Sequence, residues 1–417
     1  MKLVIITYYW PPSGGAGVQR WVKFAKYLPE YGWEPYVITV DPDYAAYPVI
    51  DETLENEVID KVNVFRTRAL DYFALLGKDK SKIPSAGFAN NADDSFKGKI
   101  SQFLRGNLFI PDPRKGWNKY AFRKACKLIR EHGISYIITT SPPHSTQLIG
   151  LKLKNKFPGI KWISDLRDPW TDIYYYDQFY PTFLSKFIDK KLERRVLERS
   201  DHIITVGQSL RNLFSMKVPD VEKKITVISN GYDNEDFNTP LPEDSGEFII
   251  TYAGTLSGKY NINGFLRCIK ELENKGIELK IRFIGSVQES QKELLDSHNT
   301  SISFIPYSDH STTIRYMRES SLLLLIIPDH PSNKSIITGK LFEYLAAGKP
   351  ILCIGPVEGD AAMIISETGH GITCTYNDHE KMTSYILKVF NKEVPDKAAP
   401  KEYSRSENTR KLVHLLR

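Results

Sequence analysis

The sequence contains two series of short apolar segments, and stretches with helical periodicity separate the segments in each series. Segments that are apolar throughout, without polar alternation, predict strands buried on both faces, as in parallel sheets covered by helices. Two such series predict an α/β fold with two doubly wound, Rossmann-like domains. The expected strands are 3–8, 36–40, 136–140, 161–164, 202–206 and 225–228 in the first series, and 248–253, 279–284, 301–305, 322–327 and 351–354 in the second.

The two series are separated at residues 239–247, where prolines, acidic residues and a glycine interrupt the apolar pattern. We therefore expect an N-terminal domain at 1–238, a linker at 239–247 and a C-terminal domain at 248–396. A helical segment at 397–417 follows. It is too short to form a domain, so we expect it to pack on a core that is already built.

Composition narrows the class of protein. The chain has 41% hydrophobic and 25% charged residues, which is typical of a globular protein and excludes intrinsic disorder. The net charge of +6 is too small for a dedicated nucleic-acid binder. The four cysteines lack metal-ligand spacing, so we expect buried thiols in a reducing compartment, no bound metal and a cytoplasmic location. No apolar run reaches the roughly 20 residues that a membrane-spanning helix needs.

A glycine-rich loop follows the first expected strand. Gly15 and Gly17 would let the backbone approach a ligand closely, and the start of the next helix would favour an anion. A dinucleotide-binding fingerprint would need a third glycine where Arg20 stands, and we expect this arginine to disturb the packing of helix on strand. A plain glycine-rich turn is the alternative.

Three further motifs follow strands of the first series. His144 follows two prolines that restrict its loop, so its ring is a candidate ligand contact or a structural side chain. Asp165, Arg167 and Asp168 form a compact charged cluster that suits hydroxyl or phosphate binding, or an internal salt bridge. Asn230 precedes a glycine, and this pair primarily predicts a turn. A ligand contact by Asn230 is the second interpretation.

The most informative motif lies in the second series. After the strand at 322–327 we expect a helix at 339–347, which Gly348 ends and Pro350 prevents from continuing. Glu343 would lie near backbone N–H groups that favour a diphosphate, and its carboxylate could bind the vicinal diol of a ribose. Lys340, three residues earlier, lies on the same face of the expected helix as Glu343. A solvated helix glutamate is the alternative.

A second glycine loop, with Gly254, Thr255 and Lys259, follows the first strand of the second series. A lysine in such a loop either faces a phosphate or lies on the ordinary surface.

In this order, the motifs resemble those of retaining glycosyltransferases of the group 1 (family 4) type, and the resemblance covers nearly the whole chain. It implies a GT-B fold, in which two Rossmann-like domains face each other across a cleft. It also implies that the C-terminal domain holds a nucleotide-sugar and that the last helix returns to the N-terminal domain.

The resemblance assigns roles by motif. Glu343 would bind the ribose hydroxyls, Lys259 and the region of Gly339 would face the diphosphate, and His144 would lie near the reacting carbon of the sugar. The expected catalytic residues are His144, Arg167 and Asp168. The expected donor-binding residues are Gly15, Gly17, Asn230, Gly254, Thr255, Lys259, Ser335, Thr338, Gly339, Lys340 and Glu343. The sugar would come from a UDP- or GDP-linked co-substrate, without a metal or other cofactor.

Two positions depart from the family pattern. Ser335 stands where the family has a second glutamate, and Thr255 stands where it has an arginine. Lys334 or Lys340 would then have to supply the missing cation. These departures keep two alternatives open, namely a sugar-nucleotide epimerase on the same scaffold and a catalytically weak nucleotide- or carbohydrate-binding protein.

The acceptor side carries basic and apolar residues together. Residues 97–131 hold ten Lys or Arg and two acidic residues, interleaved with aromatic and aliphatic side chains, and residues 184–199 continue the pattern. Such a surface suits the headgroups of an anionic membrane, where a lipid-linked acceptor would lie. We expect a glycan or lipid-linked acceptor in surface-polysaccharide or glycoconjugate assembly, with peripheral contact at the inner face of the membrane. Helices with solvated basic faces are the alternative.

Overall fold

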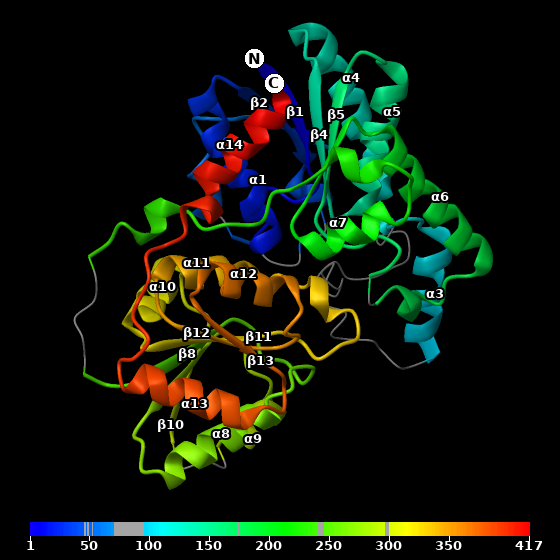
Figure 1. Ribbon diagram of the computed structural model, residues 1–417. Helices are drawn as coiled ribbons and strands as arrows, with labels where there is room; N and C mark the ends of the chain where they lie inside the picture. The colour runs from blue at the N-terminus through cyan, green and yellow to red at the C-terminus, as the bar shows by residue number, and fades with distance from the viewer. Residues whose placement is uncertain are drawn as a thin grey trace. The chain divides into compact units, whose positions relative to one another are not determined.

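The computed structural model describes residues 1–45, 47, 50–51, 53–70, 96–173, 175–240, 246–296 and 300–417. The chain forms two compact units, and each contains one parallel sheet (Figure 1). The N-terminal unit comprises residues 1–229 and 408–417, and the C-terminal unit comprises residues 230–407. The expected α/β class with two doubly wound units is confirmed.

The sheet of the N-terminal unit has the strand order β3-β2-β1-β4-β5-β6-β7. Its strands are β1 (Lys2–Ile6), β2 (Glu34–Val40), β3 (Asn63–Thr67), β4 (Tyr136–Ser141), β5 (Lys161–Leu166), β6 (His202–Thr205) and β7 (Ile225–Val227). The order reverses between β1 and β4, and open α/β sheets bind ligands beyond the carboxyl ends of the strands at such a switch point.

Helices cover both faces of this sheet (Figure 1). The helices of this unit are α1 (Ala16–Tyr27), α3 (Phe96–Leu108), α4 (Asn118–His132), α5 (Gln147–Lys156), α6 (Phe183–Arg199), α7 (Gln208–Ser215) and α14 (Arg405–Leu416). Leu3 and Ile5 of β1 share a core with α1 and α14, whereas Val4 and Ile6 share the opposite core with α4 and α5. Burial on both faces explains why this strand is apolar throughout.

The C-terminal unit repeats this plan with the strand order β10-β9-β8-β11-β12-β13. Its strands are β8 (Ile249–Ala253), β9 (Lys280–Ile284), β10 (Ser301–Ile305), β11 (Leu322–Ile326), β12 (Ile351–Ile354) and β13 (Gly371–Cys374). Its helices are α8 (Asn263–Asn274), α9 (Glu289–Leu295), α10 (His310–Glu319), α11 (Gly339–Ala347), α12 (Asp360–Thr368) and α13 (His379–Phe390). The switch point lies between β8 and β11, so the loops after these strands are the expected ligand-binding loops.

The chain passes between the units after Ser229 and again before Asn408. The carbonyl oxygen of Ser229 accepts hydrogen bonds from Asn408 Nδ2 and Arg20 NH1, both at 3.0 Å. Residues 230–238, which the sequence assigns to the N-terminal domain, belong to the C-terminal unit because Tyr232 pairs with the backbone at 403–405. Residues 241–245 of the expected linker lie outside the described residues.

The helix α14 supplies Leu412, Val413 and Leu416 to the core of the N-terminal unit. Only residues from 408 onward belong to this unit, whereas the sequence places the start of the tail at 397. Among the described helices, none is both long and apolar enough to cross a bilayer.

Candidate functional site

The amino end of α11 lies beyond the switch point of the C-terminal unit. Thr338 occupies the N-cap position, but its side chain makes no capping hydrogen bond, and its Oγ1 is buried without a partner among the described residues. The first backbone N–H groups of a helix have no partner within the helix. The end of α11 therefore offers donors and a positive dipole end to an anion. Gly348, with φ 75°, ends the helix as expected.

Lys340 lies in the first turn of α11, between the glycine loop and an aromatic ring. Its Nζ is 4.0 Å from the centroid of the Tyr252 ring. A Cβ at position 254 would lie 2.8 Å from this Nζ, and Gly254 has φ 125°, so both space and backbone conformation require glycine there. Burial lowers the pKa of Lys340 to about 7, although the Glu343 carboxylate opposes this change. A bound anion would restore the charge of this ammonium group.

Glu343 lies one turn further along α11, and its side chain is 21% exposed. Its Oε1 is 4.0 Å from Nδ1 of His310, whose Nε2 is 3.2 Å from Asp236 Oδ2. Burial raises the pKa of Glu343, while His310 lowers it. No sequence pattern indicates Asp236 and His310, because only the fold brings them to α11.

The other expected donor-binding residues of this unit lie around the same loops. Thr255 and Lys259 are exposed on the loop after β8. Ser335 ends a short 3-10 helix, Asn333–Ser335, between β11 and α11. Lys334 forms a 2.7 Å ion pair with Glu358. Of the two lysines expected to replace the family's arginine, Lys340 is therefore the one that the structure places against the glycine loop. Asn230 begins the C-terminal unit.

In the N-terminal unit, Arg167 ties the first glycine loop to the loop after β4. Its NH1 donates to the Gly17 carbonyl at 2.7 Å, and its Nε donates to the Ser141 carbonyl at 3.0 Å. A Cβ at position 17 would lie 3.0 Å from the same NH1, so glycine permits this approach. Gly15, with φ 98°, is the N-cap of α1. Burial raises the pKa of the neighbouring Asp168.

The expectation that Arg20 disturbs packing is wrong. Arg20 and Asp165 are fully buried, and Arg20 NH2 donates to Asp165 Oδ1 at 3.1 Å. Asp165 Oδ2 also accepts hydrogen bonds from Trp21 Nε1 at 2.7 Å and from Thr140 Oγ1 at 2.8 Å. The arginine is tolerated because its charge is balanced inside this network.

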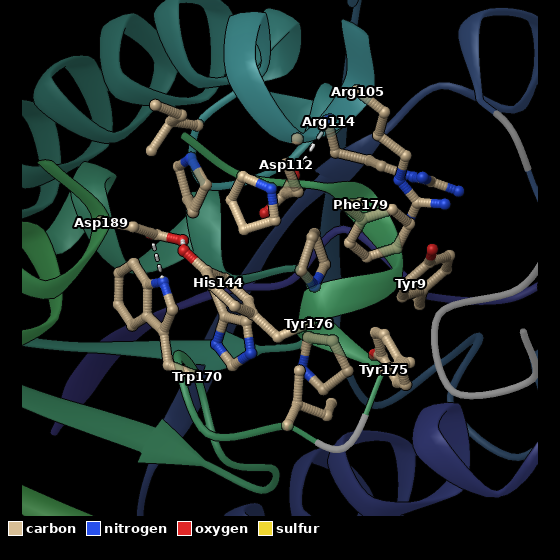
Figure 2. A pocket seen from close by; sticks show the side chains of 17 residues that line it. Tyr9, Arg105, Asp112, Arg114, His144, Trp170, Tyr175, Tyr176, Phe179 and Asp189 are labelled. Atoms are coloured by element: carbon tan, nitrogen blue, oxygen red, sulfur yellow. Dashed lines mark hydrogen bonds between the residues drawn. The ribbon is translucent and has the colours of Figure 1, made fainter. Parts of the chain in front are cut away.

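His144 begins a short 3-10 helix, His144–Thr146, beyond β4. Its ring stacks on Trp170, with centroids 4.9 Å apart and planes 13° apart. Burial, with the charges of Lys217 and Arg167, lowers the pKa of His144 to about 3, so the ring is neutral at neutral pH. It faces a pocket of about 740 Å³, a volume that includes the open mouth (Figure 2).

Metal-ligand clusters are not found in the described ranges, where no three His, Cys, Asp or Glu side chains group suitably. All four cysteines are buried and free.

The expected residues therefore gather in two places. Gly17 and Arg167 lie together beside the His144 loop in the N-terminal unit. Gly254, Lys340 and Glu343 lie together in the C-terminal unit.

Comparison with known proteins gives matches over most of the chain. The family model described as "Glycosyltransferase Family 4" matches residues 87–236, and the model described as "Glycosyl transferases group 1" matches residues 233–408. TuaH of Bacillus subtilis strain 168, which is named as a teichuronic acid biosynthesis glycosyltransferase, is 23% identical over 256 residues. That match covers 56% of this chain and 62% of TuaH, so the chain spans less than two thirds of this relative.

Solved structures share the fold. Alr3699/HepE of Anabaena, solved with UDP, superposes with a TM-score of 0.63 at 11% identity, covering 100% of this chain and 99% of HepE. A Listeria monocytogenes protein titled as a UDP-N-acetylglucosamine 2-epimerase superposes with a TM-score of 0.56 at 12% identity, covering 100% of this chain and 95% of the Listeria chain. The two family models, which together match residues 87–408, show that the chain belongs to the group 1 glycosyltransferases, and the solved structures show that it has the GT-B fold.

Proposed function

We propose that the protein transfers a sugar, with retention of configuration, from a UDP- or GDP-linked donor to a glycan or lipid-linked acceptor in the assembly of surface polysaccharide or a glycoconjugate. The observation that carries the proposal is the position of Lys340, packed between Tyr252 and Gly254 at the amino end of α11, one turn before Glu343. The UDP in the HepE structure supports a nucleoside diphosphate as the ligand.

The chemistry follows from where charge develops. Breaking the bond between sugar and diphosphate leaves negative charge on the diphosphate. Lys340 and the N–H groups of α11 would stabilise that charge more in the transition state than in the bound donor, which lowers the barrier. Glu343 would hold the ribose hydroxyls and so fix the diphosphate at the helix end.

Incubation with a panel of UDP-, GDP- and ADP-sugars separates the candidate functions. A transferase releases nucleoside diphosphate and needs an acceptor for its full rate. An epimerase, the second candidate because of its shared fold, converts the donor into its isomer. A binding protein does neither, yet its melting temperature rises with the nucleotide.

Replacement of Glu343 by alanine should weaken binding of UDP or GDP by about 1–3 kcal/mol, the scale of lost hydrogen bonds to a charged group. Isothermal titration calorimetry measures the change. Glu380→Ala, at an exposed position in the first turn of α13, is the matched control and should bind as wild type. Equal affinity in Glu343→Ala would remove this residue from the donor site.

Donor affinity should fall as pH rises above about 7, by up to tenfold per pH unit, because Lys340 must then take up a proton to bind the diphosphate. Below its pKa, Lys340 is already charged and contributes no pH dependence. Titration with a UDP-sugar at about pH 8, in buffers of different ionisation heat, should show uptake of about one proton. Lys340→Met should bind weakly and show no uptake. A flat affinity in the wild type would contradict this assignment.

We also propose a cytoplasmic location with contact at the inner face of the membrane. Support comes from the first turns of α6, where Phe183 is 87% exposed and Leu184, Phe187 and Ile188 are also exposed. Lys190 and Lys191 lie on the next turn and are exposed as well. Apolar side chains beside cations suit an anionic bilayer surface.

A further inference from the structure

The pocket that His144 faces has two chemically different sides. Figure 2 shows Trp170 and Asp189 on one side and Arg105 and Arg114 on the other. All its lining residues belong to the N-terminal unit. The roles that the family resemblance assigns to the chain leave both arginines unused.

The cationic side contains two guanidinium groups. Arg114 lies in the 3-10 helix Pro113–Trp117 and is only 6% exposed. Arg105 lies on α3, with its guanidinium carbon 4.2 Å from the centroid of the Phe179 ring. Within the described part of the chain, Arg105 makes no hydrogen bond or ion pair. Burial, together with the charge of Arg114, lowers the pKa of Arg105 to about 10.

The carboxylates that line the pocket already accept hydrogen bonds from other groups. Asp112 accepts hydrogen bonds from the backbone N–H groups of Arg114 and Ser145, at 2.9 and 2.7 Å, and from the Ser145 hydroxyl at 2.8 Å. Asp189 accepts hydrogen bonds from Trp170 Nε1 at 2.7 Å and from the Tyr176 hydroxyl at 3.0 Å. An anion entering the pocket would therefore meet the guanidinium of Arg105, whose donors can bind it in a bidentate manner.

Aromatic rings form much of the remaining wall. Tyr9, Trp170, Tyr175, Tyr176 and Phe179 line the pocket. Large rings offer flat apolar faces, and Asp189 fixes the orientation of two of them. The apolar face of a sugar ring could stack on such a wall.

An exposed apolar surface adjoins the cationic side. Gly106 and Phe179 line the pocket and are in close backbone contact, which joins α3 to the 3-10 helix Tyr176–Phe179. Asn107 accepts a hydrogen bond from the Thr182 N–H at 2.8 Å, which joins α3 to the start of α6. The exposed apolar side chains of this surface are Ile100, Phe103, Leu108, Phe183, Leu184 and Phe187.

Resting on the proposed function, we propose that this pocket binds the phosphate or diphosphate of a lipid-linked acceptor. Arg105 and Arg114 hold the phosphoryl oxygens, the aromatic wall holds the acceptor sugar beside His144, and the lipid chain leaves along the apolar surface of α3 and α6. Lys190 and Lys191, which are exposed on the next turn of α6, complement the anionic headgroups around such a lipid.

Calorimetry with farnesyl diphosphate tests the site without any turnover. The titration uses a Lys340→Met background, which removes the buried cation of the proposed donor site. Binding of farnesyl diphosphate then reports on the pocket beside His144, whether or not the proposed donor site is correct. Farnesyl diphosphate should bind, and Arg105→Met should weaken it at least tenfold, whereas Arg105→Lys should retain part of the affinity. Arg123→Met, at an exposed position on α4, is the matched control and should bind normally. Equal binding in Arg105→Met would overturn the proposal.

Two further arms identify the source of the phosphoryl group. Farnesol should bind much more weakly than farnesyl diphosphate, and equal binding would exclude recognition of the charge. Glucose 6-phosphate should also bind weakly, and equal binding would show a soluble phosphorylated acceptor and overturn the lipid-linked one.

A membrane-binding experiment tests the apolar surface of α3 and α6. The Phe183→Ser/Phe187→Ser variant, altered only at exposed positions, should lose co-sedimentation with phosphatidylglycerol vesicles. Absence of co-sedimentation in the wild type would overturn the membrane-facing part.

Discussion

Replacement of Asp165 by alanine should lower the free energy of unfolding of the N-terminal unit by about 3–5 kcal/mol, because it leaves the Arg20 charge buried without its counterion. The loss includes the hydrogen bonds that Asp165 accepts from Trp21 and Thr140. All six tryptophans lie in this unit, so urea unfolding followed by tryptophan fluorescence reports on it selectively.

A surface ion pair provides the control for this measurement. Glu198 pairs with Arg194 on α6 at 2.7 Å, and both side chains are largely solvated. Glu198→Ala should change stability by less than about 1 kcal/mol. A similarly small change in Asp165→Ala would show that water or local rearrangement compensates Arg20, and would contradict the buried-network account.

Replacement of His144 by alanine should lower kcat by about 10²–10³-fold, the effect of losing one preorganised hydrogen-bonding group in a transition state. Affinity for the nucleotide, measured by titration with UDP or GDP, should change little because Lys340 and Glu343, which we propose to hold it, lie on the C-terminal unit. Since the pKa of His144 is lowered to about 3, the ring acts as a neutral dipole. The pH profile of kcat should therefore lack a histidine step between about pH 5 and 8.

The variant His144→Phe separates catalysis from packing. It keeps the stacking on Trp170 but removes the ring nitrogens, so it should retain the melting temperature and lose turnover. His414→Ala, at an exposed position on α14, should behave as wild type. Normal turnover in His144→Phe would assign the ring to packing alone.

Most of the strands that sequence patterns predicted are central strands buried on both faces, since burial makes them apolar throughout. Two edge strands, β7 and β10, were also predicted, although β10 has no buried residue. The other two edge strands, β3 and β13, were not predicted. In β3 (Asn63–Thr67) no residue is fully buried, so polar and apolar residues mix. In β13 (Gly371–Cys374) the first residue is glycine because a Cβ there would collide with the Ile351 backbone. Local pattern cannot distinguish such strands from loops.

The candidate site was predictable where motif and helix position coincide. Lys340 and Glu343 lie in one predicted helix, and helical periodicity alone places them on the same face. The partners of Glu343 could not be predicted in this way, since His310 starts α10 and Asp236 lies in a 3-10 helix near the unit boundary. Arg20 was misjudged for the same reason, because its counterion Asp165 is distant in sequence and is brought near only by the adjacent positions of α1 and β5.

The path of the chain sets the order in which the N-terminal core can be finished. Leu412, Val413 and Leu416 cover core residues that are all made before residue 230. At about 5–20 residues per second, the ribosome needs roughly 10–40 s to synthesise residues 230–407. During that interval the apolar core residues that α14 will bury stay exposed. Chaperone binding to this surface should therefore persist until α14 emerges from the ribosome.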